Sequence, residues 1–214
     1  GFAPEGAEVY PDLDALLAAP YPNSDKTVGE MIPEKVLVIG ENLKVRRFAR
    51  YCTGVTVPYI HMAGRIGVLV NMEVKGIEAS AVTELGKDLC MQVAAMNPSF
   101  CDKADVDQAT LDKEKEIQLA LMDNDPKMAS KPLQVKEKIV LGKMSKYYEE
   151  NCLMQMEFVK EKGVSVEQHV AAVAKELGGK IAVKSFVRFE RGEGIEKKQE
   201  DFAAEVAAQM NMGK

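Results

Sequence analysis

The sequence predicts an α+β protein built from two related units, each a small antiparallel sheet of about three strands packed with helices. Three observations support this fold class. A pattern of helix, glycine and strand occurs twice, and two short strands surround a tight turn after the first copy. A highly charged stretch separates the two copies. This stretch is predicted to form an inserted antiparallel helical hairpin, a coiled coil.

The repeated unit covers residues 27–51 and 165–189, which align without a gap at an offset of 138 residues. Each copy opens with a capping box, in which a hydroxyl residue and a Glu or Gln three positions later satisfy free amides at a helix start. An apolar stripe at helical spacing then leads to glycine, which ends helices because it adopts the left-handed conformation without steric cost. Alternating apolar and polar residues follow, as in a half-buried strand. The matched pairs include Thr27/Ser165, Glu30/Gln168, Gly40/Gly178, Val45/Val183, Phe48/Phe186 and Arg50/Arg188.

Two further strands are predicted after the first copy. Residues 57–62 and 65–73 have strand-like composition and surround a turn at Ala63-Gly64, which is typical of a short β-hairpin. Together with residues 43–51 they would make a three-stranded antiparallel meander. Residues 78–96 then have apolar positions at helical spacing, and an Asn-Pro pair ends this predicted helix.

The stretch 104–150 differs in character from both flanking units. It contains two charged helical patterns, residues 107–122 and 133–150, joined by a short polar turn. Their apolar positions are sparse, so the seam between the two helices is thin. We therefore expect the hairpin to project from the body of the protein rather than to be buried on several sides.

These patterns divide the chain into four segments. A short helix is predicted near residues 12–19, and an Ala-rich helix at 202–210. Because the first residue is Gly1 and not methionine, we expect the chain to be a fragment or a processed product. The segments are an N-terminal extension or linker at 1–26, a first α+β unit at 27–103, the helical hairpin at 104–150, and a second α+β unit with a C-terminal helix at 151–214.

Composition and charge exclude several classes of function. The 214 residues are 46% apolar and 29% charged, which is ordinary for a globular protein with a real core. The net charge of −5 argues against general affinity for nucleic acid or anionic membranes. No apolar run reaches the roughly 20 residues that span a bilayer. With no secretion signal and four cysteines lacking Cys-x-x-Cys spacing, we expect reduced thiols in a cytoplasmic protein.

No set of residues stands out as a catalytic or metal-binding constellation. The sequence has two histidines, and neither has a Cys or carboxylate at metal-ligand spacing. No metal or cofactor is therefore predicted, and an enzyme is the least favoured class. The loop Ile39–Asn42 is first of all a helix stop, and His61 is a packed or surface side chain; contact with a partner is the alternative for both. Cationic residues around 44–65 are interpreted as a solvated face or as partner salt bridges.

A set of segments, in order from about residue 27 to the end, resembles one protein family. The segments are Ile39-Gly-Glu-Asn-Leu-Lys-Val-Arg-Arg-Phe48, Tyr59-Ile-His61, Gly64-Arg-Ile-Gly-Val-Leu-Val70, Ala94-Ala-Met-Asn-Pro98, Lys138-Ile-Val-Leu-Gly142, Phe158-Val-Lys160, Arg188-Phe-Glu-Arg-Gly-Glu-Gly-Ile-Glu-Lys197 and Asp201-Phe-Ala-Ala-Glu-Val206. They resemble elongation factor Ts, the guanine-nucleotide exchange factor for the translational GTPase EF-Tu. One segment alone would be weak evidence, but the ordered set is specific.

The resemblance implies two α+β subdomains, with a coiled-coil hairpin inserted in the second. It implies EF-Tu as the partner, without direct contact to nucleic acid or membrane, and it allows a homodimer or a 2:2 complex with EF-Tu. In the family, the loop that matches residues 39–42 lies near the phosphate-binding loop of the GTPase, and the histidine of the Tyr-x-His segment faces EF-Tu. The implied EF-Tu contacts are Ile39, Gly40, Glu41, Asn42, His61 and Met62. If residues 43–51 join the meander, the loop and His61 share one surface.

Two features of the family are missing from this sequence. Family members begin with a three-helix domain that docks on the GTPase, followed by a Thr-Asp-Phe-Val segment whose Asp-Phe pair disturbs the magnesium site. Asp201-Phe202 belongs instead to the C-terminal signature. Two functions therefore stay open: a factor that promotes release of GDP and Mg²⁺ from EF-Tu, and a core module that binds EF-Tu with little exchange activity of its own.

Overall fold

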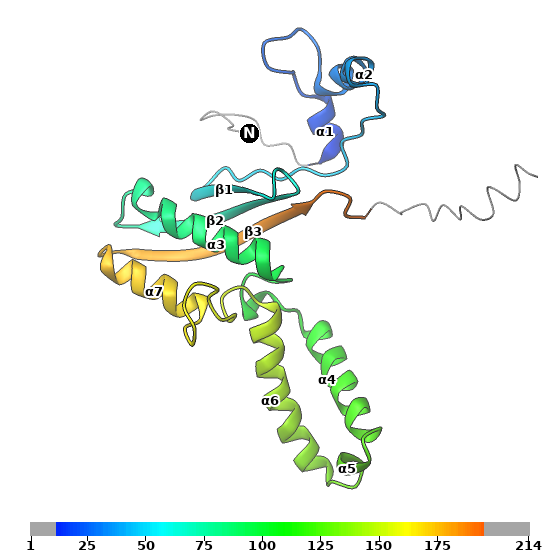
Figure 1. Ribbon diagram of the computed structural model, residues 1–214, viewed down its shortest axis with the longest axis vertical. Helices are drawn as coiled ribbons and strands as arrows, with labels where there is room; N and C mark the ends of the chain where they lie inside the picture. The colour runs from blue at the N-terminus through cyan, green and yellow to red at the C-terminus, as the bar shows by residue number, and fades with distance from the viewer. Residues whose placement is uncertain (1–11, 195–214) are drawn as a thin grey trace, which may run out of the picture.

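The computed structural model describes residues 12–194 and shows helices arranged around an antiparallel sheet (Figure 1). The fold class is α+β, as predicted. The helix predicted at 202–210 and the Asp201-Phe202 signature lie outside the described residues. The elements are α1 (Leu13–Ala18), α2 (Val28–Ile39), β1 (Val55–His61), β2 (Ile66–Lys75), α3 (Thr83–Met96), α4 (Gln108–Asp123), α5 (Pro126–Ala129), α6 (Leu133–Asn151), α7 (Val166–Glu176) and β3 (Lys180–Glu190), with short 3₁₀ helices at Ala79–Val82 and Lys103–Asp105.

The predicted β-hairpin is confirmed. β1 and β2 pair antiparallel from Val55↔Met72 to His61↔Ile66, within two residues of the bounds expected from the sequence. β2 is the central strand of the sheet, in the order β1-β2-β3. Its side chains are the most buried of the three strands, because it has a neighbour on each edge and helices over one face.

The third strand of the sheet is not the predicted one. Residues 43–51 form no strand, and the edge of β2 pairs instead with β3, from Lys75↔Lys180 to Ile66↔Glu190. Residues 12–194 thus contain one three-stranded sheet that joins the two predicted units, where the sequence predicted a sheet in each. Alternation of apolar and polar residues indicates an extended segment with one half-buried face. It does not say which strand that segment pairs with.

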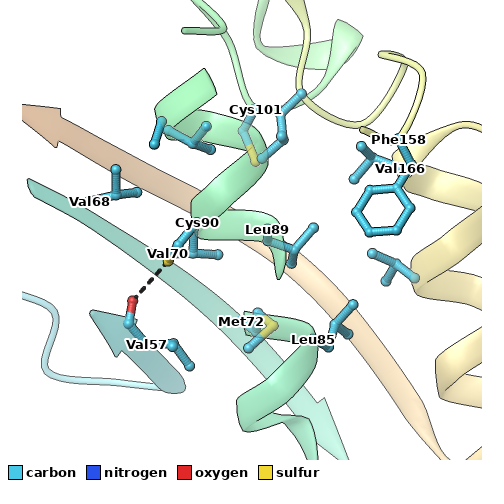
Figure 2. Packing of buried hydrophobic residues seen from close by; sticks show 14 of the residues in the cluster. Val57, Val68, Val70, Met72, Leu85, Leu89, Cys90, Cys101, Phe158 and Val166 are labelled. Carbon is cyan, nitrogen blue, oxygen red and sulfur yellow. Dashed lines mark hydrogen bonds between the residues drawn. The ribbon is translucent and has the colours of Figure 1, made fainter. Parts of the chain in front are cut away.

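The main core lies between the sheet and two helices. α3 packs against β1 and β2, and α7 packs against β3, on the same side of the sheet (Figure 1). Figure 2 shows the apolar side chains of α3 and β2 meeting there, joined by Phe158 and Val166 from the second unit. α3 approaches β1 closely at Gly86, where any Cβ would overlap the side chain of Val57. The fully buried Cys90 donates from Sγ to the carbonyl oxygen of Val57 at 3.3 Å.

Both predicted capping boxes are present. At α2 the Thr27 side chain accepts from the Glu30 amide at 3.2 Å, and the Glu30 carboxylate accepts from the Thr27 amide at 2.8 Å. At α7, Ser165 and Gln168 repeat this arrangement with distances of 3.2 and 2.9 Å. Local pairing of this kind needs four residues, so short sequence motifs predict it well.

The charged stretch forms two helices that lie side by side and extend away from the sheet, with α5 at the far end (Figure 1). A small cluster around the buried Met122, Val140 and Met144 holds α4 against α6. Near the far end Lys136 is 9% exposed. Its Nζ donates to Asp123 Oδ1 at 2.6 Å and to the Ala129 carbonyl oxygen at 3.0 Å, so the turn is tied to both helices.

Candidate functional site

The first part of the candidate site is the end of the β1–β2 hairpin. β1 ends at His61, and the Arg65 amide donates to the Met62 carbonyl oxygen at 3.1 Å to close the turn. His61 is half-buried, whereas Met62 is 60% exposed. A large apolar side chain at the tip of a hydrogen-bonded hairpin suits contact with another protein, because the backbone that carries it is already ordered.

His61 has a hydrogen-bond partner within its own strand. Tyr59 and His61 lie two residues apart on β1, so both side chains are on one face of the sheet. The Tyr59 hydroxyl lies 3.0 Å from His61 Nδ1, and the two ring centroids are 5.7 Å apart. Tyr59 also packs against the main core. The imidazole is therefore held in place by a side chain that is itself anchored.

The turn that carries Met62 has unusual backbone geometry. Met62 and Ala63 have φ angles of 50° and 51°, followed by Gly64 at 90°. The left-handed region costs a residue with a Cβ roughly 1–2 kcal/mol. Positive φ at the two central residues of a hairpin turn, here Ala63 and Gly64, matches the twist of the flanking strands. The turn therefore sets where His61 and Met62 lie at the end of the hairpin.

Replacing Ala63 with glycine is expected to raise the free energy of unfolding by about 1 kcal/mol, because glycine adopts φ near 50° without steric cost. Urea unfolding of the two proteins measures this change. Ala95→Gly is a matched control on the exposed side of α3 and is expected to lower stability by about 1 kcal/mol. If Ala63→Gly also destabilises, the turn is not strained as described.

The second part of the candidate site is the end of α2 and the loop Ile39–Asn42. Gly40 has φ 77°, and its amide donates to the Val36 carbonyl oxygen at 2.8 Å, which confirms the predicted helix stop. Ile39 is 55% exposed, and Gly40, Glu41 and Asn42 are all exposed. A Cβ at Gly40 would meet nothing within 4 Å. The loop therefore stands clear of the rest of the described chain.

The helix leading into this loop is unusually apolar for its exposure. None of the twelve residues of α2 is buried, although the helix ends in the run Val36-Leu-Val-Ile39. Leu37 and Val38 are 85% and 83% exposed. Neither residue is among the partner contacts predicted from the sequence. The sequence did contain an indication of their exposure. Four consecutive apolar residues point around most of a helix, whereas a single stripe that faces the core needs fewer.

The structure does not bring the loop and His61 together through a shared sheet. That expectation depended on residues 43–51 being a strand, and they are not. In this segment the Arg47 guanidinium lies 4.5 Å from the ring centroid of Phe189 and pairs with Glu193 at 3.0 Å. The pairing of β1, β2 and β3 puts Phe189 on the opposite face from His61. The segment therefore follows the face of the sheet that lacks α3 and α7.

A group of charged side chains lies at the same end of the sheet as His61, on the far edge strand. His61 pairs with Ile66 of β2, and Ile66 pairs with Glu190 of β3, so these residues form one row across the three strands. Glu190 accepts from Arg188 at 2.9 Å and from Arg65 at 3.3 Å. The Arg188 hydrogen bond, with smaller effects of both positive charges, lowers the pKa of the Glu190 carboxyl. Arg47 likewise lowers the pKa of Glu193. Both carboxylates stay ionised at neutral pH, so this end of the sheet carries fixed charges of both signs.

Within residues 12–194, no three His, Cys, Asp or Glu side chains are grouped in a way that could hold a metal ion. Burial raises the pKa of the Cys90 and Cys101 thiols to about 12, so neither is a reactive thiolate at neutral pH.

A groove of about 650 Å³ lies beside α7. The charged residues that line it are Glu73 and three lysines, Lys75, Lys175 and Lys180. Among the helices of residues 12–194, none is long and apolar enough to cross a bilayer.

Comparisons with known proteins give a consistent result. The sequence profile of the elongation factor TS family matches residues 6–193. Elongation factor Ts of Clostridium kluyveri is 45% identical over 190 residues, which is 88% of this chain and 60% of that protein. The Clostridium botulinum protein of the same name is 45% identical over 194 residues, 90% of this chain and 62% of that protein. The Clostridium perfringens elongation factor Ts is 44% identical over 216 residues, which is 97% of this chain and 69% of that protein. The chain thus spans about three fifths of the length of the first two relatives.

Proposed function

Since this chain belongs to the elongation factor Ts family, we propose that it binds the GTPase EF-Tu and promotes release of GDP and Mg²⁺. In this mechanism, the factor binds nucleotide-free EF-Tu more tightly than EF-Tu with GDP. By thermodynamic linkage, GDP then weakens binding of the factor by the same ratio. The chain works by differential binding and not by covalent chemistry, so it is an exchange factor and not an enzyme.

The observation that carries the proposal is the family match over residues 6–193, which includes both parts of the candidate site. The exposed apolar end of α2, with its loop Ile39–Asn42, supplies one contact to EF-Tu. His61 and Met62 at the end of the β1–β2 hairpin supply the other. Exposed apolar groups on ordered elements are typical of protein interfaces. Because the two parts lie on different elements, the GTPase would contact them with separate portions of its surface.

A second candidate is a core module that binds EF-Tu but accelerates exchange little. The family resemblance assigns the displacement of magnesium to a Thr-Asp-Phe-Val segment, and neither part of the candidate site contains the Asp-Phe pair of that segment. In this case, the loop and the hairpin end would give affinity without lowering the barrier to GDP release.

The division into subdomains and the possible oligomeric states are also proposed from the family resemblance. We infer that residues 27–103 and 151–214 are related subdomains, supported by the two equivalent capping boxes and by the glycines that follow both helices, Gly40 and Gly178. The helical hairpin at 104–150 acts as an inserted coiled coil, and residues 1–26 act as an extension.

The free factor is either monomeric or a homodimer, and its complex with EF-Tu is 1:1 or 2:2. Light scattering of the free factor and of the complex decides between these states.

The test of the function is release of a labelled GDP from EF-Tu. With the 214-residue chain added in catalytic amount, release is expected to accelerate in proportion to the concentration of the factor. Size exclusion with nucleotide-free EF-Tu tests binding separately. Co-elution without acceleration would favour the core module. Absence of both co-elution and acceleration would overturn the proposed function.

His61→Ala is expected to weaken the complex with nucleotide-free EF-Tu by about 1–2 kcal/mol, a typical loss for a contact residue. The fold is expected to stay intact, because His61 is at the rim of the core. Arg46→Gln serves as the comparison, since exposed charges usually contribute under about 1 kcal/mol. Calorimetric titration of both variants measures the difference. Loss of binding by Arg46→Gln with His61→Ala unaffected would place recognition on the other face of the sheet.

A further inference from the structure

The hydrogen bond between Tyr59 and His61 has a consequence for recognition. The Tyr59 hydroxyl and His61 Nδ1 are 3.0 Å apart, within ordinary hydrogen-bond distance. The ring centroids are 5.7 Å apart and the rings are tilted by 31°, so the two side chains meet through the hydroxyl and not by face-to-face stacking. The contact fixes which imidazole nitrogen is available to anything outside the protein.

The chemistry of the two groups decides the direction of this hydrogen bond. A phenol is far more acidic than a neutral imidazole N–H, and an unprotonated imidazole nitrogen is the stronger acceptor. The Tyr59 O–H therefore donates to Nδ1. In the neutral imidazole the proton then resides on Nε2, which makes Nε2 the ring's hydrogen-bond donor.

We propose that Tyr59 is a positioning residue, which holds His61 in the Nε2–H form so that it donates a hydrogen bond to an acceptor oxygen on the partner GTPase. The inference rests on the proposed function of the hairpin end. Tyr59 is suited to this role because it packs against the main core, so the hydroxyl that selects the tautomer is itself fixed. The donor is oriented before the partner arrives, and binding does not have to order it.

The first experiment uses the free protein and does not depend on any partner. Long-range ¹H–¹⁵N NMR at pH 8, where an ordinary histidine is neutral, reports the tautomer of each ring. His61 is expected to show the Nε2–H form strongly favoured, and Tyr59→Phe is expected to shift the nitrogen signals of His61 toward a mixture. Tyr148→Phe on α6 is the matched control and is expected to leave the His61 signals unchanged. An unchanged His61 spectrum in Tyr59→Phe would overturn the proposal.

The second experiment measures binding to nucleotide-free EF-Tu by calorimetry. Tyr59→Phe is expected to weaken binding about 2- to 10-fold, the range for one neutral hydrogen bond. In a His61→Ala background the same substitution is expected to have no further effect, because Tyr59 acts through His61. Equal losses in both backgrounds would show that Tyr59 acts on the partner or the fold directly, and the positioning role would be wrong.

A pair of amide variants tests which nitrogen matters. Glutamine places its NH₂ group near the position of Nε2, whereas asparagine places it near Nδ1. His61→Gln is therefore expected to retain more affinity than His61→Asn, and the reverse order would contradict an Nε2–H donor. If the wild-type chain does not bind EF-Tu, the proposed function fails, and the recognition role fails with it. The NMR result still tells whether Tyr59 sets the tautomer, so the two failures are distinguishable.

Discussion

Leu89→Ala is expected to lower the free energy of unfolding by about 2–5 kcal/mol, the range for removing a fully buried leucine side chain. Leu89 has no exposed surface and extends from α3 toward the second unit, between Cys90 and Val166 in Figure 2. Its removal leaves a cavity where α3, the sheet and α7 meet. The neighbours come from elements held by the sheet pairing, so they cannot collapse fully into the space.

Urea unfolding monitored by circular dichroism measures this loss. Leu121→Ala is the matched control, because Leu121 is also a helical leucine but is 55% exposed on α4. We expect the control to change stability by less than about 0.5 kcal/mol. Similar losses in the two variants would mean that the core is not centred on α3. The exchange activity of the Leu89 variant, measured well below its unfolding midpoint, is expected to stay close to that of the wild type.

Gln92→Leu is expected to lower the free energy of unfolding by about 2–3 kcal/mol, although leucine is more apolar and of similar size. Gln92 is completely buried on α3. Its Nε2 donates to the Glu157 carbonyl oxygen at 3.0 Å, and its Oε1 accepts from the Val159 amide at 2.8 Å. Leucine would leave both backbone groups without this partner, and each unmade hydrogen bond costs about 1–3 kcal/mol when water cannot replace it.

Hydrogen exchange gives this prediction a local readout. The Val159 amide is expected to exchange faster in Gln92→Leu, since the side chain that protects it is gone. Gln134→Leu, at an exposed position of α6, is the matched control and is expected to change neither global stability nor exchange at Val159. Unchanged stability in Gln92→Leu would mean that this loop is held by its other contacts.

The candidate site was foreseen in part. Spacing alone identified Gly40 as a helix stop and placed His61 on a strand, and the structure confirms both. Their role as partner contacts came from the family resemblance and stays a proposal. The hydrogen bond between Tyr59 and His61 was not anticipated, although the two-residue period of a strand puts both side chains on one face. Only the tertiary structure shows that the rings are close enough to interact.

The error at residues 43–51 has a physical cause. The segment has the alternation of a strand, as residues 181–189 have, and the two copies align without a gap. A strand exists only where another strand offers its backbone hydrogen-bonding groups, and that partner is remote in sequence. β2 accepts β3, more than 100 residues further along. The matching segment of the first unit lies outside that sheet and makes side-chain contacts, such as that of Arg47 with Phe189.

The sequence by itself determined the helix starts, the glycine stop after α2, the β1–β2 hairpin and the two helices of the charged stretch. Each of these depends on hydrogen bonds or apolar spacing within a few neighbouring residues. The tertiary structure alone decided that β3 completes the sheet and that α2 leaves Leu37 and Val38 exposed. It also decided that Tyr59 reaches His61. These features depend on which surfaces meet across long stretches of chain, and local periodicity carries no information about that choice.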